Sequence, residues 1–142
     1  MSIKQASILL SRIALFVIYF WFGLLKVIGQ SPASEMVHKM FDMTMSHIPF
    51  LSFGVFIILF GLFEMLVGIL FIIPSLEKLA LILFAVHMVT TIIPLFIMLE
   101  VWSHLFVPTL EGQYIIKNIA LVACALTVWS SLPQKIQSGV II

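Results

Sequence analysis

Glu64 and His87 are the two residues of this sequence best suited to acid–base chemistry in an apolar setting. Glu64 lies about ten or more residues from either end of the apolar stretch 50–74, and His87 lies inside the next stretch. At about 1.5 Å per helical residue, at least ~15 Å separates Glu64 from either end, so its side chain cannot reach water. Because their depths match, we expect Glu64 and His87 to be adjacent. They could accept a proton or bind a ligand, or they could form a structural pair that keeps two helices in register.

Two lysines could bring positive charge to the same site. Lys26 lies near the end of the first apolar stretch and Lys117 near the start of the fourth, so both are expected on one side of a helical bundle. Two ammonium groups repel each other unless a carboxylate or a ligand's oxygen lies between them. We therefore expect Glu64 or a ligand between the lysines. Alternatively, Lys26 extends its ammonium to the lipid headgroups, as lysines near helix ends can.

Further residues complete the predicted binding site: Tyr19, Phe22, Thr91 and Asn118. Tyr19 and Phe22 lie on or beside the polar face of the first stretch, where their rings could stack against a ring of a ligand. Thr91 shares the helical face of His87, and Asn118 opens the fourth stretch beside its lysine. We expect these side chains to line a polar cavity within the apolar helices.

The composition argues against several classes of function. Cys124 is the only cysteine, which excludes an intrachain disulfide, a CxxC redox pair and a thiolate-rich metal site. A formal charge of +1 gives no reason to expect a nucleic-acid partner. The methionines and histidines of residues 36–47 could in principle bind copper, but methionines at helical spacing more often pack against lipid or protein. No metal site is predicted, and the sequence leaves open whether the protein is an enzyme.

Four apolar stretches must position these residues, at about 8–28, 50–74, 79–100 and 114–132. A hydrocarbon core of about 30 Å needs roughly 20 helical residues. With 63% hydrophobic residues and a mean hydropathy of +1.27, the chain has too little polar surface for a soluble globule. The sequence therefore predicts an all-α membrane protein, residues 1–142 forming a single domain built as an up-down bundle of four transmembrane helices.

Between the first two stretches, residues 29–49 are expected to contain a short interfacial helix. Ser31 and Pro32 resemble an N-cap followed by proline at the first helical position. Met36, Met40 and Met43 then recur at helical spacing. We expect this helix on the non-cytoplasmic face of the membrane.

Gly54, Gly61 and Gly68 recur every seven residues in the second stretch. This spacing places all three on one stripe of a helix. Small residues on such a stripe let another membrane helix approach closely. The stripe therefore offers a place where another helix can pack closely.

The distribution of positive charge predicts that both termini are cytoplasmic. Lys4, Arg12, Lys78 and Lys135 all fall on one side of the four stretches, and Lys39 opposes them. The first apolar stretch is longer than the ~7 to 15 residues of a signal-peptide core, so we expect an uncleaved first helix.

The spans and their inserted polar residues resemble the DoxX-like family of small four-helix integral membrane proteins. The resemblance covers nearly the whole chain and supports the four-helix fold. The matching residues are Arg12, Phe22 to Lys26, Gly61 to Glu64, Gly68, His87 and Met88, Thr90 and Thr91, and Gly112 to Asn118.

This resemblance implies a bacterial cytoplasmic (inner) membrane protein with the lipid bilayer, a membrane or periplasmic protein, or a second copy as partner. Family members look like quinone-linked redox subunits, parts of oxidative-stress complexes, or accessory proteins in the maturation of others. The preferred interpretation is a redox or stress-complex subunit that binds a quinone. The lysines would hydrogen-bond a carbonyl oxygen while Glu64 or His87 relays a proton. The alternative is a non-enzymatic assembly partner; a small-solute carrier is disfavoured because no inverted repeat is visible.

Overall fold

The computed structural model describes residues 1–132, which are mostly helical. Two short strands, pairing as an antiparallel hairpin, are an addition that the sequence patterns did not predict. In chain order the elements are α1 (Ile3–Val27), α2 (Ser34–Thr44), α3 (Phe53–Ile72), α4 (Glu77–Ile92), α5 (Pro94–Ile97), η1 (Leu99–Val101), β1 (Trp102–His104), β2 (Val107–Pro108), α6 (Leu110–Lys117) and α7 (Ile119–Trp129).

Four helical segments are long and apolar enough to cross a membrane. The first is α1 and the second is α3. The third joins α4 to α5 across Pro94, and the fourth joins α6 to α7. These segments confirm the predicted helical class and the number of candidate membrane spans.

Local capping explains where these segments begin. α1 starts at Ile3, before the expected position 8, because Ser2 and Gln5 form a capping box, with Ser2 N donating to Gln5 Oε1 at 2.8 Å. α3 starts at Phe53, after position 50, since the Ser52 side chain accepts from Val55 N at 3.4 Å. The fourth segment starts at Leu110 rather than 114 because Thr109 caps α6 in the same way.

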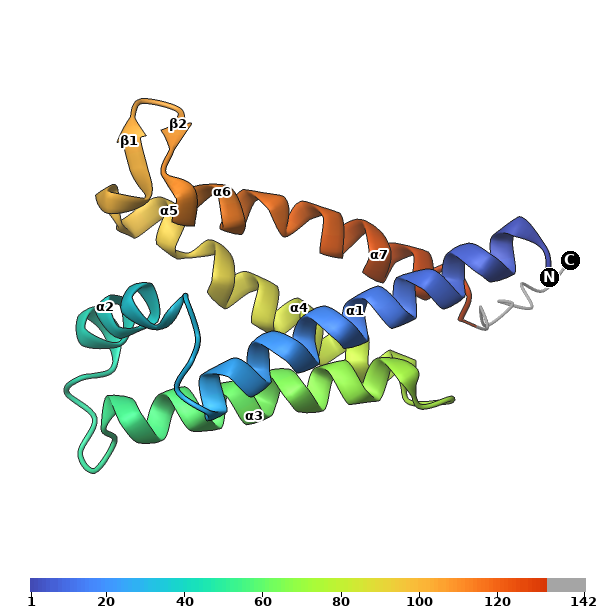
Figure 1. The fold of residues 1–142 in the computed structure, drawn as a ribbon, viewed down its shortest axis with the longest axis horizontal. Helices are drawn as coiled ribbons and strands as arrows, with labels where there is room; N and C mark the ends of the chain where they lie inside the picture. Colours follow the sequence, from blue (N-terminus) through green and yellow to red (C-terminus); the bar gives the residue numbers. More distant parts are fainter. Residues whose placement is uncertain (133–142) are drawn as a thin grey trace, which may run out of the picture.

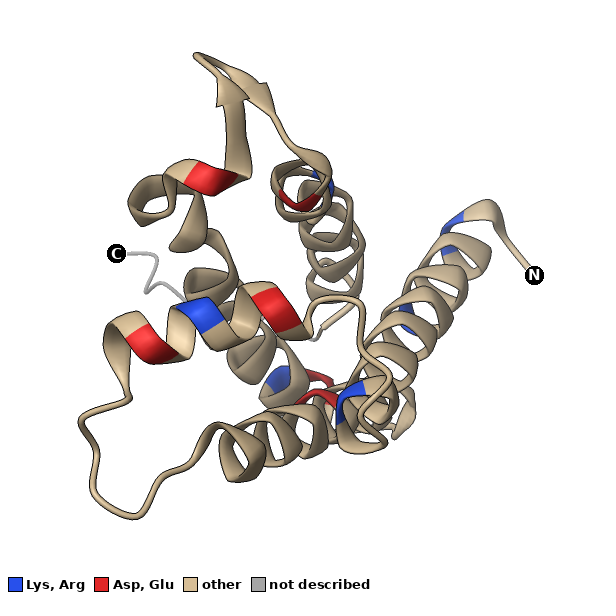
Figure 2. Ribbon diagram, turned by 60° about the vertical axis from the view of Figure 1, so that its left-hand side comes forward, with Lys and Arg blue, Asp and Glu red and all other residues tan. Residues whose placement is uncertain are grey.

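The long helices run in alternating directions along the longest axis of the molecule (Figure 1). α1 packs along α3 and also contacts α7, while α4 contacts both α3 and α7. At one end α3 and α4 are joined by a short turn, and at the other end they diverge and α2 lies between them (Figure 1). Figure 2 shows charged positions on α2 and on the facing η1 and α6 segments. The two ends of the molecule therefore differ in shape.

Glycines allow α1 and α3 to approach closely. A Cβ atom at Gly61 would lie 2.6 Å from the Gly23 carbonyl oxygen, and one at Gly68 would lie 2.9 Å from Phe20 N. Gly54 has only Ser52 Oγ, at 4.0 Å, near the same position. Two of the three predicted glycines therefore face α1 as expected. Gly54 takes no part in this contact, because α1 ends at Val27, before it reaches the first turn of α3.

Arg12 ties α1 to the turn between α3 and α4. Its Nε donates to the Phe71 carbonyl at 2.7 Å, and its Nη1 lies 2.9 Å from Glu77 Oε1. Glu77 lies in the first turn of α4, where a negative charge also interacts favourably with the helix dipole. The main apolar core lies near this end, between α1, α3, α4 and α7, and includes Leu15, Val67, Phe71, Phe84 and Val128.

Candidate functional site

A buried chain of polar side chains connects α1, α3 and α4. Lys26 Nζ lies 2.6 Å from Glu64 Oε2, and His87 Nε2 lies 3.0 Å from Glu64 Oε1. Tyr19 Oη lies 2.9 Å from His87 Nδ1. All four residues are buried, with relative exposures of 4–7%. The predicted contact between Glu64 and His87 is thus confirmed, and we call these four residues the buried network.

The direction of each hydrogen bond follows from the chemistry of Glu64. A carboxylate only accepts, so Lys26 donates to one oxygen and the His87 Nε2–H donates to the other. In a neutral imidazole Nδ1 is then the acceptor, and the Tyr19 hydroxyl donates to it. The positive charge of Lys26 offsets the negative charge of Glu64, which reduces the cost of placing both inside apolar helices.

Thr91 completes the polar surroundings of His87. Its Oγ1 donates to the His87 carbonyl at 2.9 Å and also lies 3.3 Å from His87 Nδ1. This hydroxyl comes from the next turn of the same helix. The Thr91 hydroxyl therefore lies beside the same ring nitrogen that accepts the hydrogen bond from Tyr19.

Phe60 is a site residue that the sequence analysis missed. Its ring is stacked on the imidazole of His87, with centroids 5.3 Å apart and planes 23° apart. Lys26 Nζ lies 5.4 Å from the same ring centroid, within the range of a cation–π interaction. Phe60 precedes Glu64 by one helical turn, so helical spacing could have identified it.

A series of ring contacts connects this site to the surface of α2. His38 stacks on Phe53 with centroids 4.0 Å apart, and Phe53 contacts Phe41 at 5.9 Å. Phe41 contacts Phe56 at 5.3 Å, and Phe56 stacks on Phe60 at 5.7 Å. The position of α2 is therefore linked by packed rings to the imidazole of His87.

Besides Thr91, which contacts His87, three predicted site residues lie outside the buried network. Phe22 is 45% exposed, because Tyr19 and Gly23 turn the opposite face of α1 toward α3 and α4. Lys117 is exposed, and its Nζ lies 5.7 Å from the ring centroid of Tyr114 in its own helix. Asn118 lies at the break between α6 and α7. Within residues 1–132, Glu64 pairs with Lys26 and not with Lys117.

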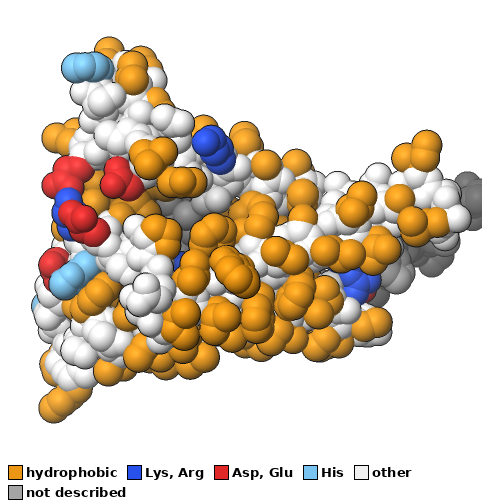
Figure 3. All heavy atoms as spheres, viewed as in Figure 1, with side chains coloured by type: hydrophobic (Ala, Val, Ile, Leu, Met, Phe, Trp, Pro, Cys, Tyr) orange, Lys and Arg blue, Asp and Glu red, His pale blue; other side chains and the backbone are white. Residues whose placement is uncertain are grey.

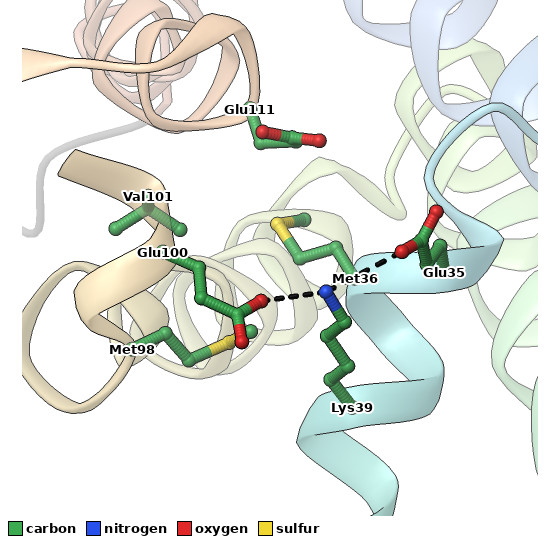
Figure 4. Close-up of a pocket in the computed structure, with 7 residues that line it drawn as sticks. All are labelled: Glu35, Met36, Lys39, Met98, Glu100, Val101 and Glu111. Atoms are coloured by element: carbon green, nitrogen blue, oxygen red, sulfur yellow. Dashed lines mark hydrogen bonds and ion pairs between the residues drawn. The ribbon is translucent and has the colours of Figure 1, made fainter. Parts of the chain in front are cut away.

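A second polar cluster lies where α2 meets η1 (Figure 4). Lys39 Nζ lies 2.6 Å from Glu100 Oε2 and 3.3 Å from Glu35 Oε1, and these hydrogen bonds raise the pKa of Lys39. Glu111 lines the same small crevice, whose volume is about 40 Å³. Figure 3 shows charged side chains gathered at this end and apolar side chains over the long helices. The Lys39–Glu100 pair thus fastens α2 to the segment that follows the third span.

Comparisons with protein-family models, curated proteins and solved structures give no match for this chain. The resemblance to the DoxX-like family therefore stays a prediction. The buried network itself defines a class of site, an acid–base cluster inside candidate membrane spans. Such a cluster can hold, take up or transfer a proton.

Proposed function

We propose that this chain is a multi-pass, DoxX-like protein of the bacterial inner membrane. Its four apolar segments cross the bilayer up-down-up-down, with both termini in the cytoplasm and α2 at the outer interface. Lys4, Arg12 and Lys78 support this orientation because all three lie toward the same side of the four segments, and Lys and Arg are enriched on the cytoplasmic side of membrane proteins. Lys135, which the sequence places on that side too, lies outside the described residues.

Within that membrane, we propose a subunit of a redox or oxidative-stress complex that binds a small amphipathic ligand, most simply a quinone. One observation carries the proposal: side chains from α1, α3 and α4 form a continuous hydrogen-bonded chain inside apolar spans. A charge at the bilayer centre costs at least ~2.5 to 3.5 kcal/mol on insertion scales, and intramembrane ionisable groups usually serve ligands or protons.

Each residue of the buried network has a role in this proposal. Lys26 is the donor for a ligand's carbonyl oxygen, since its ammonium has three N–H groups and its hydrogen bond to Glu64 uses one of them. Glu64 or His87 relays the proton that such an oxygen needs when the ligand accepts electrons from a redox partner, since the Glu64 carboxylate and the free-base nitrogen of His87 can each take up a proton and pass it on. Tyr19 donates to His87 Nδ1 and so holds the imidazole in place, and Phe60 offers an aromatic face beside Lys26 and His87.

Quinone retention tests this proposal. The wild-type protein and variants are extracted from membranes into lipid nanodiscs, and bound quinone is measured by mass spectrometry per mole of protein. Lys26→Met should lose bound quinone, while Lys117→Met, a lysine outside the buried network, should retain it. No quinone in the wild type, or equal retention in both variants, would contradict quinone binding at this site.

A second candidate function is a non-enzymatic assembly partner for another membrane protein. One observation favours it: within residues 1–132, every buried side-chain nitrogen and oxygen already has a hydrogen-bond partner. A network whose polar atoms are all paired needs no ligand, and its role can be purely structural, to specify how the helices pair. In that case Lys26→Met should weaken the co-purification of a protein partner and leave any quinone content unchanged.

A further inference from the structure

Two loop tips at the α2 end of the molecule carry fully exposed apolar side chains. Phe50, in the connection from α2 to α3, has a relative exposure of 105%. Leu105 and Phe106, at the turn of the β1–β2 hairpin, have exposures of 85% and 84%. In water, such side chains would be unfavourable at these positions. The tips lie on opposite sides of the α2 end in both Figure 1 and Figure 2.

The backbone at both tips makes the choice of phenylalanine more unusual. Phe50 has φ 67° and Phe106 has φ 60°, in the left-handed region that residues other than glycine rarely adopt. Because His104 pairs with Val107, Leu105 and Phe106 form a two-residue hairpin turn, for which Asn-Gly and similar pairs are preferred. The local backbone thus favours small or polar residues, and the phenylalanine side chains need another explanation.

The position of the two loop tips relative to the membrane spans explains their apolar side chains. Phe50 precedes the start of α3 by three residues, and the hairpin lies between the third span, which ends at Ile97, and the fourth, which begins at Leu110. Both tips therefore lie where apolar helices end. The hairpin projects sideways from the long helices instead of continuing along their axis (Figure 1). The apolar surface of the helices continues to this end, with charged side chains gathered there as well (Figure 3).

We propose that Phe50 and the Leu105–Phe106 turn are anchors that insert into the lipid interface on the α2 side, on opposite sides of the bundle. Their partner is the phospholipid bilayer itself, because aromatic and apolar side chains at span ends favour this depth. The anchors hold α2 and the Lys39–Glu100 pair at the membrane surface. The inference rests on the proposed membrane crossing but is independent of proton transfer and quinone binding.

Spin labels in reconstituted vesicles test this proposal. Single cysteines replace Phe50, Leu105 or Phe106 in a Cys124→Ala background, and each nitroxide's collision with oxygen and with a water-soluble nickel chelate is measured. A label at Val86, exposed on the middle of the third span, reports lipid, and one at Asp42, exposed on α2, reports water. Phospholipid vesicles with phosphatidylethanolamine and phosphatidylglycerol serve as the membrane.

If the tips are anchors in the lipid interface, their labels should collide with oxygen in preference to the nickel chelate more than the Asp42 label does and less than the Val86 label does. Labels at the tips that collide with the nickel chelate as often as the label at Asp42 does would overturn the proposal. Labels that are immobile and shielded from both reagents would also overturn it, because they would indicate a protein partner. If the Val86 label also collides with the nickel chelate as often as the Asp42 label does, the proposed membrane crossing is contradicted, and the proposed anchors are contradicted with it.

Discussion

The carboxylate of Glu64 lies between the ammonium of Lys26 and the imidazole of His87, at 2.6 Å and 3.0 Å. One acidic side chain therefore joins α1 to α4 through α3 inside apolar helices. Removing any of these partners leaves a buried polar group without its counterpart. The stability of the bundle and the proposed chemistry consequently depend on the same atoms.

Lys26→Met should lower the thermal stability of the protein in nanodiscs. The substitution leaves the Glu64 carboxylate without its charged partner, and breaking a buried pair costs roughly 3 to 5 kcal/mol in soluble proteins. The double variant Lys26→Met with Glu64→Gln should recover part of this loss, since no uncompensated charge remains. Lys117→Met is the matched control and should leave the unfolding temperature unchanged. Equal destabilisation by both lysine variants would argue against the Lys26–Glu64 pair.

Gly61→Ala should destabilise the contact between α1 and α3, whereas Gly54→Ala should not. The added methyl at Gly61 would lie 2.6 Å from a backbone oxygen of α1, and such overpacking typically costs about 1 to 3 kcal/mol. Gly54 has open space at the same position, so alanine there should be neutral or slightly stabilising. Thermal unfolding of the two variants in one detergent gives the comparison. A neutral Gly61→Ala would show that the two helices are farther apart.

Tyr19→Phe should preserve the fold and impair proton transfer. The ring still packs near Phe84, whose centroid lies 5.6 Å from that of Tyr19, but the hydroxyl that donates to His87 Nδ1 is lost. A single hydrogen bond contributes about 0.5 to 1.5 kcal/mol, so the change in stability should be small. Proton uptake by reconstituted vesicles on chemical reduction of the bound quinone with dithionite should fall by a larger factor than the quinone content. Unchanged proton uptake would remove Tyr19 from the proton pathway.

The Lys39–Glu100 pair should hold α2 in place at neutral pH and release it at strongly alkaline pH. The raised pKa of Lys39 means that its stabilising charge is fully present below its unfolded value and is lost as pH rises through its folded value. Glu100→Lys should increase hydrogen exchange in α2, and adding Lys39→Glu should restore protection. High salt should weaken the pair because it is exposed. Exchange that is the same in all variants would show that apolar packing alone holds α2.

The sequence predicted the centre of the buried network better than its edges. The contact between Glu64 and His87 follows from their matched depth together with the cost of a carboxylate that faces lipid. Phe60 lies one turn from Glu64 but resembles any other apolar span residue, so its stacking on His87 emerged only from the structure. Lys117 was expected in the site because its depth resembles that of Lys26. Depth does not fix which way a helix faces, and Lys117 faces away from the buried network, at the end of α6.

The pairings at the α2 end could not be predicted either. Lys39 and Glu100 are separated by 61 positions and have no periodic relation, yet the divergence of α3 and α4 brings α2 against η1. The left-handed conformation of Phe106 is equally invisible in the sequence, because turn chemistry would place glycine or asparagine there. Patterns of hydrophobicity locate helices, whereas these contacts depend on how the helices are joined.

Infrared difference spectroscopy of the quinone-loaded protein tests the central claim most directly, namely that the buried network exchanges a proton with its ligand. On electrochemical reduction of the quinone, the wild type should show a change in the carboxylic-acid carbonyl band that shifts in heavy water. Glu64→Gln should abolish this band, while Glu111→Gln, a carboxylate outside the buried network, should keep it. A wild type without the band, or a band that persists in Glu64→Gln, would contradict the account.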